Sequence, residues 1–273
     1  MPWTRDHIDN WLKPSGKKLS SADGRPISVY EFVHQPNAAI LKKWAKHFRN
    51  HYCLDTEIDV LMDGIGGTRA EYLTAVKFPD RTSGLGPSVR SGDFAEILVA
   101  DFLQYTLGFW VPRTRYSNKI NRNQSPAGCD IIGFGVSDPA KISSKDTLAI
   151  YEVKAQLSGV KAKKRLQDAV DDSGQDPVRK AESLNALRQR LLQEKKKKDA
   201  DLVARFQNIT DRPYRQAFGA VAVFSTAVYD AAIVGKTLAM KHPHATKLSL
   251  VVIHGADLMD LVHSLYERAA NEA

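Results

Sequence analysis

Two stretches of this chain combine charged side chains with apolar, β-branched sequence. Asp130 opens the run from Cys129 to Phe134, and Glu152-Val153-Lys154 lies inside the run from Leu148 to Ala155. Both runs have the length and composition of buried strands. Because side chains alternate along a strand, Glu152 and Lys154 share one face and Val153 takes the other. Burying a carboxylate and an amine is costly unless they have partners or a function.

An acid on one strand followed by acid-x-lysine on the next is typical of metal-dependent phosphodiester cleavage. The reaction builds negative charge on phosphate oxygens, and a divalent cation neutralises that charge and lowers the pKa of a bound water. Asp130 and Glu152 are the expected ligands of Mg²⁺, with Mn²⁺ as its substitute, and the backbone carbonyl of Val153 is a third candidate ligand. Lys154 would orient or deprotonate the attacking water, or stabilise the developing charge.

The tripeptide alone is a weak signal, because acid-x-lysine recurs at Glu194-Lys195-Lys196 in a charged run typical of an exposed helix. Only Glu152-Val153-Lys154 lies in an apolar strand that follows an acid-bearing strand at hairpin distance. The alternative interpretation is a buried Lys–Glu pair that fixes strand register, a role that buried ion pairs sometimes have.

A third carboxylate lies in an apolar helix. Ser91 is a candidate N-cap, and residues 92–107 are expected to form a helix that stops at Gly108. A helix that is apolar on nearly every side is typically buried. Glu96, in its middle, is therefore a candidate catalytic residue and metal ligand, and the alternative is a carboxylate that reaches solvent. Asp101 is expected to point outward.

The order of these elements resembles the core of the PD-(D/E)xK, or restriction-endonuclease-like, superfamily. A narrower resemblance, over about residues 88–260, is to the HamA family, the nuclease component of the bacterial Hachiman anti-phage system. The segments that carry this resemblance are Ser91–Leu98, Gly108–Arg113, Asn121–Asn123, Gly128–Asp130 and Tyr151–Lys154.

This resemblance implies a restriction-endonuclease-like mixed sheet flanked by helices, and a nuclease that degrades DNA beside a HamB-like helicase. It also implies catalytic roles for the matching residues, which are Glu96, Asp130, Glu152 and Lys154. Cys129 stands where the superfamily's namesake motif has proline, a position that varies widely. Two alternatives stay open: a nuclease of the same fold that cuts structured RNA or tRNA, and a non-catalytic module that binds nucleic acid or docks onto a helicase.

The formal net charge of +8 is concentrated after the acid-x-lysine strand. Residues 155–215 hold 15 Lys and Arg against 9 Asp and Glu, a balance of +6. A basic region beside a cleavage site suits a polyanionic substrate. The polar segment 117–128 is either a plain exposed loop or a further phosphate contact, whereas Lys195–Lys198 is more typical of a solvated helix end. The candidate nucleic-acid contacts are Arg122, Lys161, Lys163, Lys164 and Arg165. The alternative for residues 161–165 is a solvated helical face.

Composition limits the class of protein. At 273 residues, with 43% apolar and 26% charged residues, the chain is typical of a globular protein. No run approaches the length of a membrane span, and the N-terminus lacks the layout of a signal peptide. Two cysteines, Cys53 and Cys129, do not make a disulfide framework, so free thiols in the reducing cytoplasm are expected.

Residues 1–87 are expected to form an N-terminal α+β extension, and residues 88–273 the nuclease domain. The extension is the candidate docking site for a partner that restrains the nuclease. Its expected elements are a strand at 27–33, a helix at 37–52 and a strand at 72–78. In the nuclease domain we expect strands at 109–116, 129–134, 148–155, 219–225 and 248–253, and further helices at 161–172, 176–208 and 257–268. The sum is an α/β fold with helices on both faces of a mixed sheet.

His47 and His51 are four residues apart in the expected helix at 37–52. Phe48 stands in place of the glutamate of a zinc protease motif. The two histidines are therefore expected to be surface or packing residues.

Overall fold

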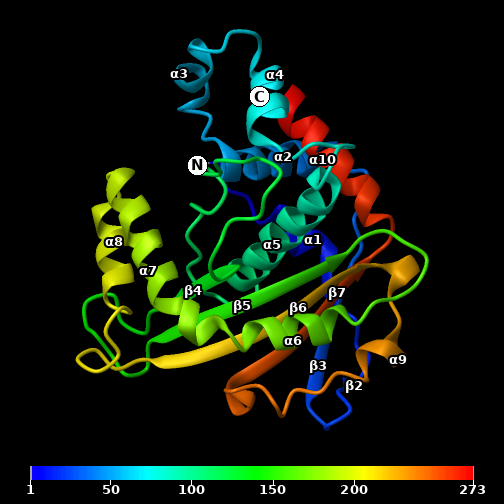
Figure 1. The fold of residues 1–273 in the computed structure, drawn as a ribbon, viewed down its shortest axis with the longest axis vertical. Helices are drawn as coiled ribbons and strands as arrows, with labels where there is room; N and C mark the ends of the chain where they lie inside the picture. Colours follow the sequence, from blue (N-terminus) through cyan, green and yellow to red (C-terminus); the bar gives the residue numbers. More distant parts are fainter. Residues whose placement is uncertain (1, 273) are drawn as a thin grey trace.

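A mixed sheet organises the protein, and the computed structural model describes residues 2–272 around it (Figure 1). Within this part of the chain the sheet has seven strands in the order β1-β3-β7-β6-β5-β4, with β2 beside β3. The parallel strands are β3 (Pro26–Phe32), β7 (Leu248–Gly255), β6 (Arg215–Ser225) and β5 (Thr147–Gln156). The antiparallel strands are β4 (Ile131–Gly135), which pairs with β5, and β1 (Leu12–Pro14) and β2 (Leu19–Ser20), which pair with β3. The predicted α/β fold with a mixed sheet is confirmed.

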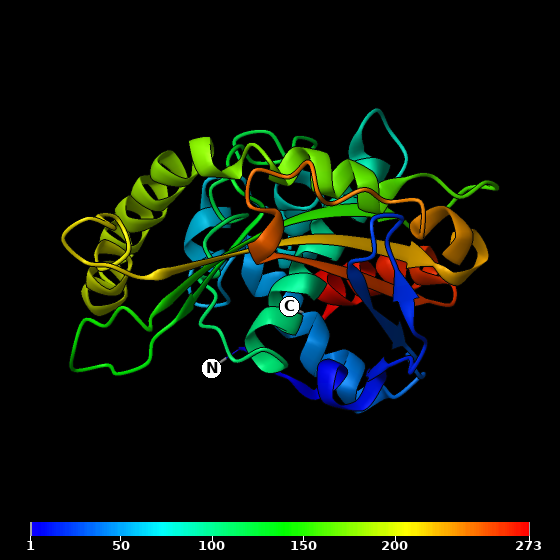
Figure 2. The same cartoon turned by 90° about the horizontal axis from the view of Figure 1, so that it is seen from below.

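Helices cover both faces of the sheet (Figure 2). One layer contains α1 (Asp6–Trp11), α2 (Ala38–Tyr52), α5 (Gly86–Tyr105) and α10 (Leu258–Asn271). The other contains α6 (Arg165–Ser173), α7 (Asp176–Gln193), α8 (Lys197–Ala204) and α9 (Ala231–Val234). Tyr151 and Val153 of β5 pack into the α5 layer, and Leu148 and Ile150 into the α6 layer. Strand alternation therefore directs Glu152 and Lys154 to the α6 face.

The central strands pack so closely that some positions accept only one residue type. β6 and β7 are continuous apolar runs, as suits strands that are buried on both faces. Gly219 of β6 lies against the ring of Tyr151 on β5, and a Cβ at this position would come within 2.2 Å of that ring. Only glycine permits this approach.

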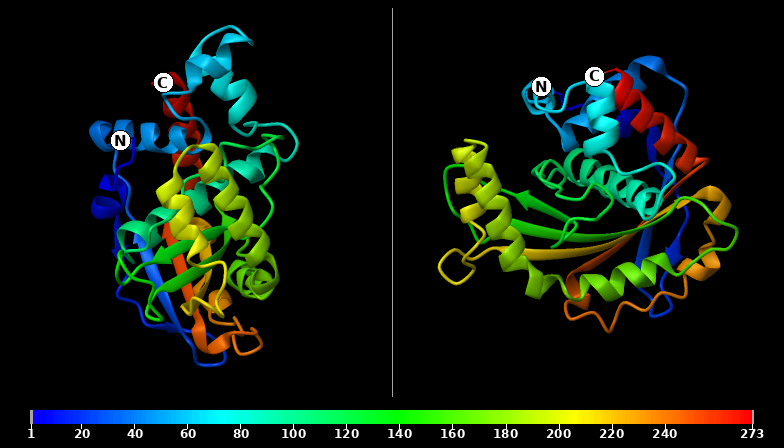
Figure 3. Two further views of the ribbon diagram at one scale, coloured as in Figure 1. Left: turned by 90° about the vertical axis from the view of Figure 1, so that its left-hand side faces the viewer. Right: turned by 45° about the horizontal axis from the view of Figure 1, so that its top comes forward.

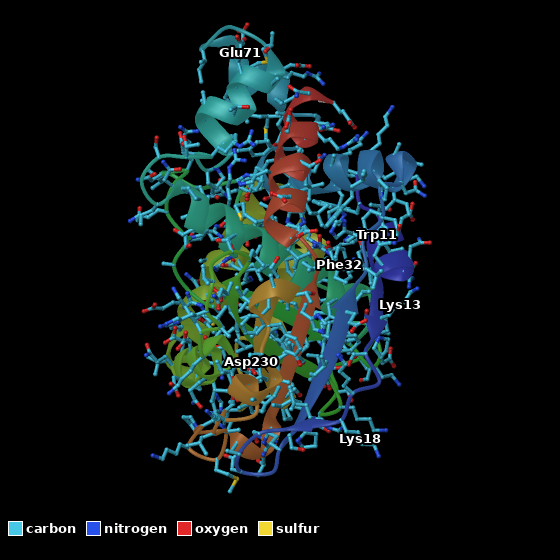
Figure 4. The ribbon with its side chains drawn as sticks, turned by 90° about the vertical axis from the view of Figure 1, so that its right-hand side faces the viewer. Trp11, Lys13, Lys18, Phe32, Glu71 and Asp230 are labelled. Atoms are coloured by element: carbon cyan, nitrogen blue, oxygen red, sulfur yellow. The ribbon has the colours of Figure 1, made fainter. Side chains whose placement is uncertain are left out.

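The N-terminal residues contribute to the same sheet and core. β3 pairs along its length with β7, and Trp11 lies 5.9 Å from Phe32, ring centre to ring centre. Figure 4 shows these two side chains turned inward, with Lys13 and Lys18 on the outer edge. The predicted boundary at residue 87 therefore falls between two parts of one continuous sheet.

Residues 58–77 lie apart from the strands, at the end of the molecule that Figure 3 shows uppermost. They form α3 (Ile58–Asp63), α4 (Arg69–Tyr72) and the π-helix η1 (Leu73–Lys77). The strand predicted at 72–78 is wrong. Thr68 and Glu71 form a reciprocal capping box that starts a helix there, and this local signal outweighs the β-branched residues that follow.

The strand predicted at 109–116 is also wrong. A single bridge joins Trp110 to Phe134, and the chain then leaves the sheet. Pro112 has no N–H to continue a ladder, and the side chains of Arg113 and Arg115 pair with acids on α5 instead. The segment is a connection that is fixed by ion pairs rather than by strand pairing.

Helix boundaries differ from the prediction at three points. α5 begins at Gly86 with Pro87 in its first turn, so Ser91 is not its N-cap. α6 begins at Arg165, later than the start of the helix predicted at 161–172, whereas α7 begins at Asp176 as predicted. The helix predicted at 176–208 is two helices, because Lys195 adopts a left-handed conformation (φ 58°) and the chain reverses into α8.

The remaining elements are short 3₁₀ turns, η2 (Thr226–Val228) and η3 (Ala245–Lys247). Cys53 and Cys129 are both buried and unpaired. Among residues 2–272, no helix combines the length and the apolar character that crossing a membrane would require.

Candidate active site

The site lies at the N-terminal end of β4. Ile131, the first residue of β4, pairs with Tyr151, so the end of β5 has no strand neighbour on this edge. Asp130 occupies the edge: its Oδ2 accepts a hydrogen bond from the backbone N–H of Val153 at 3.0 Å. The N–H and the carbonyl of one strand residue point toward the same neighbour. The carbonyl of Val153 therefore lies on the edge that Asp130 occupies.

Glu152 and Lys154 lie on the α6 face, as their alternation predicts. The Nζ of Lys154 donates to Oε1 of Glu152 at 2.7 Å and contacts Oδ2 of Asp172 on α6 at 2.6 Å. Glu152 is 3% exposed, and its Oε2 has no hydrogen-bond partner among the described residues. One buried carboxylate oxygen of the site therefore keeps its full capacity to bind a cation or a donor.

Glu96 reaches the same edge from the opposite face of the sheet. It lies on α5 and is 7% exposed, so it does not extend into solvent. Its Oε2 accepts hydrogen bonds from Nε of Arg115 at 2.8 Å and from the hydroxyl of Tyr116 at 2.6 Å. Arg115 also donates to Oδ1 of Asp130 at 2.9 Å. The unpaired edge of β5 is therefore the place where Glu96, from the α5 layer, and Asp130, at the sheet edge, share Arg115 as a partner.

Neighbouring carboxylates act on the pKa of Asp130. Burial and the negative charges of Glu96 and Glu152 raise the pKa of Asp130 well above its ordinary value, although Arg115 and the Val153 N–H oppose them. The site is therefore short of positive charge. Carboxylate and carbonyl oxygens are the ligands that Mg²⁺ prefers, so the donor set and the unpartnered Oε2 of Glu152 fit a hard divalent cation.

Lys154 is held in its charged form. Burial favours the neutral amine, but the hydrogen bonds with Asp172 and Glu152 outweigh it and raise the pKa of Lys154 above its ordinary value. An ammonium cannot accept a proton. Of the roles predicted for Lys154, orientation of a water and stabilisation of charge fit this geometry, and proton abstraction does not.

A cleft of about 570 Å³ opens beside these residues. Glu96, Asp130, Val153 and Lys154 all line it, whereas Glu152 lies behind Lys154 and does not. The cleft gives a phosphate a route to Glu96, Asp130 and Lys154.

The predicted nucleic-acid contacts divide into three groups. Lys163 and Arg165 line the cleft. Lys161 and Lys164 are exposed nearby but do not line it. Arg122 is committed elsewhere, because it donates to the carbonyl of Phe78 at 3.2 Å and pairs with Asp80 at 3.1 Å, which ties residues 74–80 to the loop.

Sequence reasoning missed three charged residues of this region: Arg115, Asp172 and Asp176. Asp176 is fully buried, and neither of its carboxylate oxygens has a hydrogen-bond partner among residues 2–272. Burial and the charge of Glu152 raise the pKa of Asp176 to about 7. Its position before Pro177 indicated only a helix start, and Arg115 lies in the segment 109–116, which was predicted as a strand and does not form one.

A second buried cluster lies further along α5. Asp101 was expected to point outward, but it is fully buried. Its Oδ2 lies 2.9 Å from Nε2 of His7 and 3.1 Å from Nε2 of His47, and its Oδ1 lies 2.6 Å from the guanidinium of Arg113. His51 completes the cluster at 3.3 Å from His47. The two helical histidines are therefore packing residues in a charged network.

His47, His51 and Asp101 have the residue types and the proximity of a metal site, but their hydrogen bonds argue against one. The backbone N–H of Thr4 donates to Nδ1 of His47 at 3.1 Å, so the ring hydrogen is on Nε2 and faces Asp101. Burial lowers the pKa of His47 to about 4, which keeps the ring neutral. A metal at Nε2 would require the opposite tautomer and would repel Arg113.

Comparison with known protein families gives one result. The model of the HamA family matches residues 5–269 of this chain. No curated protein matches this chain. The match includes β3 and the rest of the N-terminal part, as well as the cleft.

Proposed function

Because this chain belongs to the HamA family, whose members are components of the Hachiman defence system, we propose that it is a metal-dependent deoxyribonuclease that acts beside a HamB-like helicase. The observation that carries the proposal is the approach of Glu96, Asp130 and Glu152, with the ammonium of Lys154, at one edge of the sheet beside an open cleft. A buried lysine–glutamate pair that only fixed register would need neither the cleft nor two further acids.

The residues have distinct roles in this proposal. Asp130, Glu152, Glu96 and the carbonyl of Val153 would hold Mg²⁺, or Mn²⁺ in its place. The bound ion supplies charge neutralisation and an activated water. The ammonium of Lys154 holds Glu152 in position and stabilises negative charge that develops on the phosphate.

Substrate binding is assigned to the basic rim of the cleft. Lys163 and Arg165 lie where the phosphates that flank the cut would pass. Backbone phosphates give affinity without sequence preference, which suits degradation of invading DNA. The cytoplasm, where such DNA and the helicase are found, is the place we propose for the protein.

Restraint by the partner is part of the same proposal, since an unrestrained nuclease would damage its host. The N-terminal part is the candidate docking region. β3 from this part lies inside the sheet, so deletion of residues 1–87 would remove core structure along with any docking surface. Charge substitutions on its exposed helices, with co-purification of the helicase as the readout, test docking without removing a strand.

Cleavage assays test the activity. Plasmid DNA is incubated with the full chain, with and without the helicase, in Mg²⁺ or in EDTA. We expect cleavage in Mg²⁺ only, and its loss in Asp130→Asn and in Lys154→Met. The matched control is Glu194→Gln, which breaks an exposed acid-x-lysine pair with Lys196 (2.6 Å) far along the chain from the cleft.

Two outcomes would contradict the proposal. Undiminished cleavage in both Asp130→Asn and Lys154→Met would show that the cleft does not carry the reaction. Parallel digestion of structured RNA that proceeds while DNA stays intact would show that the substrate is RNA.

A further inference from the structure

The connection between α5 and β4 carries a regular series of bases along the acids of α5. We name residues 113–119 the basic strap. Arg113 pairs with Asp101 at 2.6 Å, Arg115 with Glu96 at 2.8 Å and Lys119 with Asp93 at 2.6 Å. The strap therefore runs antiparallel to α5, with one base on each acid.

Arg115 differs from the two outer bases because it binds two acids. Its guanidinium bridges Glu96 and Asp130 and also donates to two carbonyls, those of Cys129 at 2.7 Å and Pro126 at 3.2 Å. The planar fork of an arginine suits this arrangement, and the single ammonium of a lysine does not. A fixed positive charge thus lies between two of the carboxylates to which we assigned the metal.

We propose that Arg115 is an internal counter-ion of the cleft, which positions Glu96 and Asp130 and competes with the divalent cation for them. The inference rests on the proposed function, since it concerns the metal site of that activity. A guanidinium and a divalent cation repel each other when they share the same carboxylate oxygens. Metal binding at Asp130 therefore requires the Arg115 side chain to turn away, and the position of this side chain sets the metal affinity of the protein.

The strap itself can stay in place during this change. The outer pairs are the more deeply buried, with side chains of Arg113 and Lys119 exposed by 8% and 4%, against 16% for Arg115. Breaking a buried pair leaves an uncompensated charge, which is costly. Displacing Arg115 from its acids costs less free energy than breaking an outer pair, because the incoming cation then neutralises Glu96 and Asp130. Rotation of one side chain is therefore the least costly route.

Metal affinity without DNA tests this inference independently of catalysis. Binding of Mn²⁺ to the full chain is measured by titration calorimetry and by electron paramagnetic resonance. We expect Arg115→Gln to bind Mn²⁺ at least about tenfold more tightly than the wild type, equivalent to roughly 1.4 kcal/mol. Arg115→Lys should fall between the two. In the double variant with Asp130→Asn, the increase in Mn²⁺ affinity should disappear, which would assign the tighter binding to this site. If Arg115 had only a structural role, Arg115→Gln would bind Mn²⁺ more weakly than the wild type, because the metal ligands would be held less firmly in position.

Arg205→Gln is the matched control. Arg205 is similarly buried, at 11% exposure, and likewise binds a carboxylate, Asp146 at 2.6 Å, and the carbonyls of Asp138 and Lys141. Its loss should lower the melting temperature and leave Mn²⁺ affinity unchanged.

Equal or weaker Mn²⁺ binding by Arg115→Gln, in protein that melts cooperatively, would overturn the inference. If that variant does not fold, Arg115→Lys decides, and affinity at or below the wild-type value would overturn it. A protein whose Arg115 variants bind Mn²⁺ tightly at Asp130 but which cuts no DNA would contradict the proposed function and leave the counter-ion role standing.

Discussion

Two buried charge clusters lie five residues apart on α5, one around Glu96 and one around Asp101. Each pairs its acid with an arginine of the basic strap, Arg115 or Arg113. The first opens into a cleft, and among residues 2–272 the Oε2 of Glu152 beside it has no hydrogen-bond partner. The second is closed off, with Asp101 and its histidines fully or almost fully buried and both Asp101 oxygens close to nitrogens of His7, His47 or Arg113. Residue types alone would favour the second as a metal site.

The pKa directions show why the clusters differ. At Asp130, burial and two neighbouring carboxylates outweigh Arg115 and raise the pKa. At Asp101, Arg113 and His47 outweigh burial and hold the pKa well below its ordinary value. The cluster around Asp130 has too little positive charge to balance its carboxylates, whereas the cluster around Asp101 has enough. Unmet charge and access, rather than the presence of histidine and aspartate, indicate a place for a cation.

The largest expected effect is on cleavage by the open cluster. Glu152→Gln should lower the cleavage rate by about 10³-fold or more, on the scale of a lost charge-stabilising group, without lowering the melting temperature. The substitution removes a charge that raises the pKa of both Asp130 and Asp176, so the folded state loses a repulsion. Plasmid digestion measures the cleavage rate, and melting curves measure the stability. A large fall in stability would show that Glu152 is a structural residue.

The sealed cluster should respond in the opposite way. Asp101→Asn leaves the charge of Arg113 buried and uncompensated, so we expect a loss of about 3–5 kcal/mol of unfolding free energy by urea denaturation. Cleavage by the folded fraction at low temperature should keep its Mg²⁺ dependence. If EDTA or Zn²⁺ changes the melting temperature of the wild type but not that of Asp101→Asn, the cluster is a metal site after all.

Asp176 gives a pH-dependent test of the charge deficit. Its pKa is raised from 3.8 to about 7, so the folded state holds a proton that the unfolded state releases. Its contribution is therefore favourable below about pH 4 and is lost as pH rises toward 7. Asp176→Asn should raise stability at pH 8 by the order of 2 kcal/mol relative to its effect at pH 4, measured by urea denaturation at both values. An equal effect at both values would place Asp176 outside the charge-deficient site.

The smallest effect is expected at the rim. Lys163→Ala should weaken DNA binding several-fold and reduce the slope of log K against log salt by about 1, because one phosphate contact is lost. Lys161→Ala, outside the cleft, should change the slope less. Fluorescence anisotropy over a salt series compares them, and equal slopes for the two variants would remove the cleft rim as the binding surface.

Local sequence patterns were enough for the parts of the site that depend on periodicity. Alternation along Leu148–Ala155 placed Glu152 and Lys154 on one face, and the all-round apolar character near Glu96 indicated a buried helix. The same reasoning failed at 72–78, where a capping box outweighed strand propensity, and at 109–116, where ion pairs with α5 replaced a ladder.

The sequence by itself determined the α/β class, the acidic strand positions and the buried helix, because these follow from side-chain spacing over a few residues. Only the tertiary structure decided that the pairing of β4 with β5 extends no further than Ile131, which leaves an edge of β5 where Glu96 on α5 comes close to Asp130. It also decided that Arg115 lies between those two acids and that Asp176 is buried near Glu152. These positions depend on contacts between distant segments and on irregular backbone, for which no spacing rule exists.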